Sequence, residues 1–115
     1  DTSDVALKTN IVSLSSGLDY IKQLRPVNFD WREFANGSGK AAGFIAQEVE
    51  LVTPENVKGT DYFPAVNPDT ENEIAGSSGK SINVTGIVAY LTKAVQELSV
   101  KNDALEAEVE ALKNA

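Results

Sequence analysis

A serine and a lysine, Ser3 and Lys8, stand five positions apart near the start of the chain. A lysine that has lost its proton can act as general base toward a serine hydroxyl, and the serine oxygen then becomes a nucleophile for acyl transfer. The chain contains neither histidine nor cysteine, so Lys, Asp or Glu must supply any base. Taken alone, the pair also fits a capping serine beside a surface lysine, because this spacing is common by chance.

The composition limits what else the chain can do. A net charge of −7 over 115 residues argues against binding of nucleic-acid phosphates, which requires clustered Lys and Arg. No apolar run approaches the roughly 20 residues of a membrane span, and no signal peptide opens the chain. We therefore expect a soluble, intracellularly made acidic domain with no nucleic-acid or membrane partner and no metal or cofactor.

Three further motifs do not predict chemistry. Residues 76–81 end like a phosphate-binding loop, but two residues separate the glycines where that motif needs four, and a solvated loop is expected. Residues 83–85 form a glycosylation sequon, which has no meaning without a secretory signal. Glu48 and Glu50 lie in an acidic helix with no other metal ligands nearby, and a solvated face is expected.

The elements that must position Ser3 and Lys8 follow in the first half of the chain. A short helix is predicted where Leu18, Ile21 and Leu24 share one face, with residues 15–17 as its cap, and Arg25-Pro26 ends it. Residues 27–32 alternate apolar and polar, which predicts a strand with one buried face.

The middle of the chain is less regular. Residues 43–52 suit a short helix, or a strand that runs into one, and Thr53-Pro54 ends it. Residues 56–81 are rich in loop residues, although a loose hairpin is plausible there. Tyr62 and Phe63 are expected to pack against the core.

The last third, residues 82–115, has no proline and only Gly86 interrupts a strong helical pattern. Apolar residues repeat every seven positions in two series three residues apart, with a single Asn in one series. These heptads over four repeats predict a coiled coil. The predicted interface consists of Val88, Leu91, Val95, Leu98, Asn102, Leu105, Val109 and Leu112.

Flanking charges favour a parallel arrangement. Lys101 would face Glu106 of the next chain, and Glu108 would face Lys113, so both pairs attract. Val and Leu at the interface, with a buried Asn102, favour a coiled coil of two helices. The preceding globular part can override this preference. The other interpretation of this segment is a single amphipathic helix that packs on its own domain.

Four stretches in order resemble the Peptidase S74 family. Residues 3–11 and 17–31 are similar to the opening of that family, residues 43–49 to its central signature, and residues 87–98 to its closing helix. The resemblance runs from Ser3 to about Val100, and the order and spacing of the motifs agree with the family.

The resemblance implies a trimeric intramolecular chaperone at the C-terminus of phage tail spikes, endosialidases and tail fibres. It implies Ser3 as nucleophile and Lys8 as general base of a self-cleaving serine endopeptidase, with Thr2 and Asp4 flanking the cut on one side or the other of Ser3. Gln47 is a candidate for support of the site. Ala6 stands where the family often carries a basic residue, a departure that could alter the activation of Lys8.

The expected fold is α+β: a globular part of short helices and a β element over residues 1–81, then a long C-terminal helix over residues 82–115 in a parallel trimeric coiled coil. The expected partners are two further copies of the chain and the upstream stalk of its own polypeptide. The expected location is the host cytoplasm during phage assembly, as a virion tail precursor released after cleavage. The alternatives are a non-cleaving trimerisation clamp of the same fold and, without support from charge or flanking sequence, a membrane-tethered eukaryotic transcription regulator.

Overall fold

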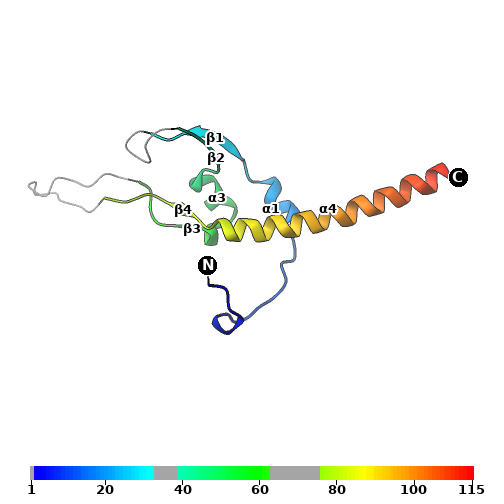
Figure 1. Cartoon of the computed structure of the whole chain (residues 1–115), viewed down its shortest axis with the longest axis horizontal. Coiled ribbons are helices and arrows are strands. Elements are labelled where there is room, and N and C mark those ends of the chain that lie inside the picture. The colour runs from blue at the N-terminus through cyan, green and yellow to red at the C-terminus, as the bar shows by residue number, and fades with distance from the viewer. Residues whose placement is uncertain (1, 33–38, 63–75) are drawn as a thin grey trace, which may run out of the picture.

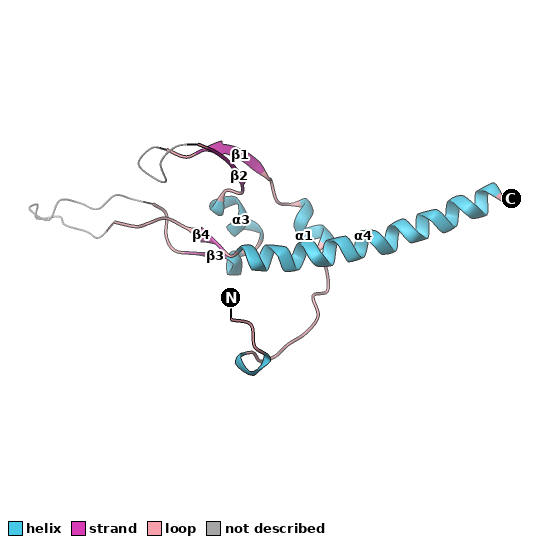
Figure 2. Cartoon of the chain, in the orientation of Figure 1, coloured by secondary structure: helices cyan, strands magenta, loops and turns pink. Residues whose placement is uncertain are grey.

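The fold, taken from a computed structural model, consists of short helices and two small sheets, from which one long helix projects (Figures 1 and 2). The structure describes residues 2–32, 39–62 and 76–115. The elements in order are η1 (Val5–Leu7), α1 (Leu18–Lys22), β1 (Val27–Asp30), β2 (Lys40–Gly43), α3 (Ala46–Val52), η2 (Pro54–Asn56), β3 (Val57–Lys58), β4 (Ser81–Ile82) and α4 (Val84–Lys113). This architecture confirms the predicted α+β class.

The first sheet joins β1 and β2 in an antiparallel pair, with Val27 opposite Gly43 and Asp30 opposite Lys40. The predicted strand is confirmed, and β1 alternates half-buried and exposed side chains as its sequence indicates. Trp31 lies just beyond the strand and meets the ring of Phe29 edge to face, with 5.0 Å between ring centroids. This contact continues the apolar face of β1 past its last ladder residue, although Trp31 is 42% exposed and not buried as the alternation predicts.

The hydrophobic core lies where α3, β3 and the first turns of α4 meet. Val49 on α3 is only 1% exposed and packs with Val57 and Ile87. The prediction of a strand that runs into a helix over residues 43–52 is confirmed, since β2 ends at Gly43 and α3 begins at Ala46. The core is completed at its edge by partly buried Leu24, Phe44, Ala46 and Ile82.

The long helix begins at Val84, two residues later than the helical pattern from residue 82 predicts. Ile82 belongs to β4, where it pairs with Val57 of β3, and this antiparallel pair is the predicted hairpin connection. Asn83 then caps α4, its side-chain oxygen accepting the N–H of Gly86 at 3.4 Å. The strand contact and the cap therefore set the start of the helix.

The N-cap of α1 is Gly17, which lies within the predicted cap of residues 15–17, and no side-chain hydrogen bond from the cap residue satisfies the helix start. The carboxylate of Glu97 on α4 accepts these N–H groups instead. Tyr62 is 53% exposed and not packed into the core, because it lines an open pocket; Phe63 lies outside the described residues.

Candidate active site

The residues before α1, here called the N-terminal segment (residues 2–16), contain a single turn of 3₁₀ helix. Asp4 caps this turn, its carboxylate accepting the N–H of Ala6 at 2.8 Å. The N–H of Lys8 donates to the carbonyl of Val5 at 3.1 Å. The turn reverses the chain, so that Lys8 returns toward Ser3.

The structure brings Ser3 and Lys8 into contact. The ammonium Nζ of Lys8 donates to Oγ of Ser3 at 2.5 Å, so the two side chains are in direct hydrogen-bond contact. The two side chains therefore lie together as predicted. Their contact depends on the turn that Asp4 caps. Their roles as nucleophile and base stay a prediction.

The pair lies on the surface of a single chain. Ser3 and Lys8 are exposed, and so are Thr2 and Asp4 beside them. The apolar side chains of the turn, Val5 and Leu7, are 72% and 70% exposed. Figure 1 shows the N-terminal segment set apart from α3 and joined to the globular part only through the start of α1. These two apolar side chains are therefore largely uncovered in the single chain.

Gln47 makes its described contact elsewhere. Its amide donates to Oδ1 of Asp61 at 3.0 Å, and the Lys80 ammonium lies 3.6 Å from the same oxygen. The bond from Gln47, followed by the charge of Lys80, holds the pKa of Asp61 below its usual value. Lys80 also pairs with Glu50 on α3. These contacts tie Asp61 and Lys80, on two separate stretches of chain, to α3, and support of the dyad by Gln47 stays a prediction.

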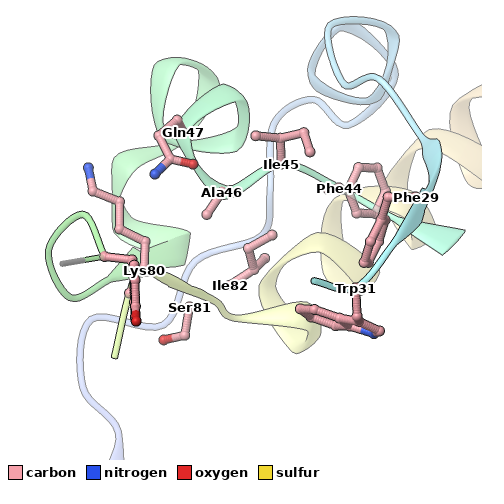
Figure 3. Close-up of a pocket in the computed structure, with 11 residues that line it drawn as sticks. Phe29, Trp31, Phe44, Ile45, Ala46, Gln47, Lys80, Ser81 and Ile82 are labelled. Atoms are coloured by element: carbon pink, nitrogen blue, oxygen red, sulfur yellow. The ribbon is translucent and has the colours of Figure 1, made fainter. Parts of the chain in front are cut away.

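Gln47 and Lys80 also border a pocket of about 510 Å³ on the globular part. Figure 3 shows these two polar side chains at one end and the rings of Phe29, Phe44 and Trp31 at the other. The pocket is therefore apolar at one end and charged at the other. It is formed by β1, α3 and the residues around β4, and neither Ser3 nor Lys8 lines it.

The predicted coiled-coil interface of α4, called the seam below, is uncovered. Its apolar members are between 46% and 77% exposed, and Asn102 is exposed as well. These apolar residues are Val88, Leu91, Val95, Leu98, Leu105, Val109 and Leu112. A row of this length in water is unfavourable, and such a row is typical of a helix that associates with others.

A second face of α4 packs on the chain's own domain. Ile87 and Ala94 are 5% and 2% exposed, and the ring of Tyr90 stacks on Tyr20 of α1 with 4.0 Å between centroids. The helix thus uses Ile87, Tyr90 and Ala94 for its intramolecular contacts and leaves the seam free. The alternative of a helix that simply packs on its own domain accounts for this second face but not for the seam.

Within residues 2–32, 39–62 and 76–115, no helix is both long and apolar enough to cross a bilayer. Over the same ranges, no group of acidic side chains is arranged to hold a metal ion. Glu48 forms a two-point ion pair with Arg25 at 2.6 and 3.0 Å, which lowers the pKa of the Glu48 carboxyl.

The family comparison matches the segment that carries this geometry. Residues 3–58 match the Peptidase S74 family, described as the chaperone of endosialidase. Residues 3–58 are therefore a Peptidase S74 segment. The family predicted from the sequence motifs is confirmed, and the Peptidase S74 match begins at Ser3 itself.

Two curated relatives align with most of the chain. The chain is 28% identical over 109 residues to the long tail fiber protein Gp37 of Enterobacteria phage K3, and equally similar to that of Enterobacteria phage T2. The alignments cover 93% of this chain but only 8% and 7% of those proteins.

Glu97 on α4 is a residue that the sequence motifs did not single out. Its carboxylate holds the start of α1, as described below. A signal was present: Ile87, Tyr90 and Ala94 form a helical stripe separate from the heptads, and Glu97 continues that stripe at the next turn.

Proposed function

We propose that this chain is an intramolecular chaperone that trimerises, assists the folding of an upstream tail-fibre stalk and then releases itself by autoproteolysis at Ser3. The observation that carries the proposal is the agreement of two findings: the Peptidase S74 match begins at Ser3, and Oγ of Ser3 accepts a hydrogen bond from Lys8. The long tail fiber relatives indicate the kind of stalk. The expected location follows: host cytoplasm during assembly, within a virion tail precursor.

Trimerisation is supported by the seam of α4. An exposed apolar row on a 30-residue helix needs partners, and the charges of Lys101 and Glu106 favour parallel ones. Parallel association would bring the same end of each upstream stalk to the same level. The stalk chains would then be aligned in register before they fold together.

The proposed chemistry is acyl transfer within one chain. Neutral Lys8 removes the hydroxyl proton of Ser3, and Oγ attacks the carbonyl carbon of Thr2, which it reaches through a five-membered ring. Lys8 then returns the proton to the departing amine of Ser3, leaving an ester that water hydrolyses. The upstream product ends in the new carboxylate of Thr2. The downstream product begins at Ser3, which has a free amine and its hydroxyl restored. Attack on the carbonyl of Ser3 itself would form a strained four-membered ring, so we place the cut between Thr2 and Ser3.

The exposure of the dyad supports a link between assembly and cleavage. A lysine base works best in a desolvated site, and an oxyanion needs fixed donors. The N-terminal segment of a single chain is open to water, and the apolar side chains of Val5 and Leu7 are uncovered. A neighbouring protomer or the folded stalk would supply cover and donors, so cleavage would follow assembly.

The test uses the full parent chain, expressed with Ser3 intact, with Ser3→Ala and with Lys8→Ala. Masses measured under denaturing conditions should show cleavage only in the unmodified chain, with a new N-terminus at Ser3. If the unmodified chain also stays full length, the protease proposal fails. If Lys8→Ala is cut normally, the dyad is wrong although the family assignment stands.

A non-cleaving trimerisation clamp is the second candidate. The observation that favours it is that the seam is independent of the dyad: α4 could hold trimers together whether or not Ser3 reacts. The same experiment separates the two, because a clamp leaves all three chains at full length under denaturing conditions.

A further inference from the structure

We infer that Glu97 is a positioning residue that fixes the base of the N-terminal segment, and therefore the Ser3–Lys8 pair, to the coiled-coil helix. The anchoring itself is independent of the proposed cleavage; its consequence for the reaction rate rests on that proposal. Neither the family match, which ends at residue 58, nor the heptad pattern assigns a role to Glu97.

The anchor consists of one carboxylate oxygen with two backbone donors. The N–H groups of Gly17 and Leu18 donate to Oε1 of Glu97 at 2.5 and 3.2 Å, from positions 80 and 79 residues away in the chain. These N–H groups begin α1, where no helical carbonyl can accept them. An ionised acceptor makes such bonds short and strong. Both N–H groups also hold the pKa of Glu97 below its usual value, so the carboxylate is charged at neutral pH.

Close backbone packing reinforces this anchor. Gly17 is buried against α4 so tightly that a β-carbon there would lie 2.3 Å from the carbonyl oxygen of Tyr90 and 2.6 Å from the backbone nitrogen of Ala94. Only glycine fits this approach. Tyr20, one turn further along α1, then stacks on Tyr90. The chain from Gly17 to Tyr20 is therefore held on α4, and Glu97 supplies the polar part of that hold.

The N-terminal segment depends on this point of attachment. The hydrogen bonds described for Ser3, Asp4 and Lys8 stay within the segment, and Figure 1 shows it leaving the globular part at the start of α1. Its position relative to the rest of the molecule is therefore set where Gly17 meets Glu97. Loss of the anchor would let the segment swing and leave the Ser3–Lys8 contact itself intact.

The position of Glu97 on α4 connects the anchor to assembly. Glu97 is adjacent in sequence to Leu98 of the seam and follows Val95 by two residues. A coil that orders α4 around these seam residues holds the Glu97 carboxylate in place as well. Trimerisation would therefore act on the helix that holds the base of the N-terminal segment.

The experiment measures the anchor and the reaction separately. Amide hydrogen exchange, resolved by mass spectrometry, is followed over residues 9–18 in the full parent chain carrying Ser3→Ala, which stays uncut. Cleavage rates are measured in the chain with Ser3 intact. Glu97→Ala and Glu97→Gln are compared with Asp103→Asn, a control that removes one carboxylate from an exposed position of the same helix outside the seam.

Glu97→Ala should raise exchange at Gly17 and Leu18 by about tenfold, and Glu97→Gln, which keeps a neutral acceptor, by less. Cleavage should slow in the same order, while the fraction of trimer stays equal to that of the Asp103→Asn control. A general loss of folding would lower both the cleavage rate and the fraction of trimer. Unchanged exchange in Glu97→Ala would overturn the inference even where the parent chain cleaves. A parent chain that is never cut overturns the proposed autoproteolysis instead, and the exchange result then decides the role of Glu97 alone.

Discussion

Gly86 of α4 lies directly against the carboxamide of Asn56: a β-carbon on Gly86 would lie 2.0 Å from Oδ1 of Asn56. In the sequence, Gly86 is the one interruption of a strong helical pattern. In the fold, Asn56 is 5% exposed, and its amide lies 3.5 Å from the Tyr20 hydroxyl. The glycine makes room for a buried polar side chain between η2 and the first turn of α4.

Gly86→Ala should therefore destabilise the domain. An alanine in a helix is normally favoured over glycine by about 1 kcal/mol. Here the overlap with Asn56 should outweigh that gain and cost about 1–3 kcal/mol net, as overpacked interiors do. Chemical denaturation of the domain measures the change. Ser99→Ala, exposed on the same helix, is the control and should stay within about 0.5 kcal/mol.

The clash itself can be tested with a double variant. Adding Gly86→Ala to a chain that already carries Asn56→Ala should cost less than adding it to the unmodified chain, because the opposing carboxamide is gone. Equal costs in the two backgrounds would mean that contact with Asn56 does not explain the glycine.

Disruption of the seam should impair assembly and cleavage together. Leu105→Asp places a charge in the C-terminal half of the seam, and Ala104→Asp places the same charge on an adjacent exposed position outside it. Light scattering should show loss of trimer only for Leu105→Asp, since a buried unpaired charge is costly. Cleavage of the parent chain should fall with it. Full cleavage by a monomeric Leu105→Asp chain would separate the two activities and contradict the proposed link.

The parallel arrangement can be tested by charge exchange. Lys101→Glu would face Glu106 of the next chain in a parallel coil, so it should lower the melting temperature at low salt. Combining it with Glu106→Lys restores opposite charges and should recover most of that loss. In an antiparallel coil these two positions do not meet, and the double variant would show no such recovery.

The charge of Glu97 should make its contribution depend on pH. The Gly17 and Leu18 N–H groups depress its pKa in the folded chain below the ordinary 4.5, so its stabilisation is complete above that value and is lost as pH falls through the folded pKa. The melting temperatures of the unmodified chain and Glu97→Gln should therefore differ at pH 7 and converge in acid. Glu48 and Asp61 also have lowered pKa values, so only the difference between the two chains isolates Glu97. A difference that persists at low pH would show that the charge is not what Glu97 contributes.

The sequence by itself determined the features that depend on local periodicity. Heptads predict the long helix, alternation predicts β1, and ordered motifs predict the family, because each of these signals is read from neighbours along the chain. The pairing of Ser3 with Lys8 also lies within reach of sequence, since one capped turn brings the two together.

Tertiary structure alone decided which distant groups meet. The start of α1 is satisfied not by the serines before it but by Glu97, 80 residues away from Gly17, and Gln47 reaches Asp61. Local propensity carries no information on such partners, which follow from how helices pack. The same packing buries Ile87 and Ala94 and leaves the seam open, because a helix of 3.6 residues per turn can present two faces to two different partners.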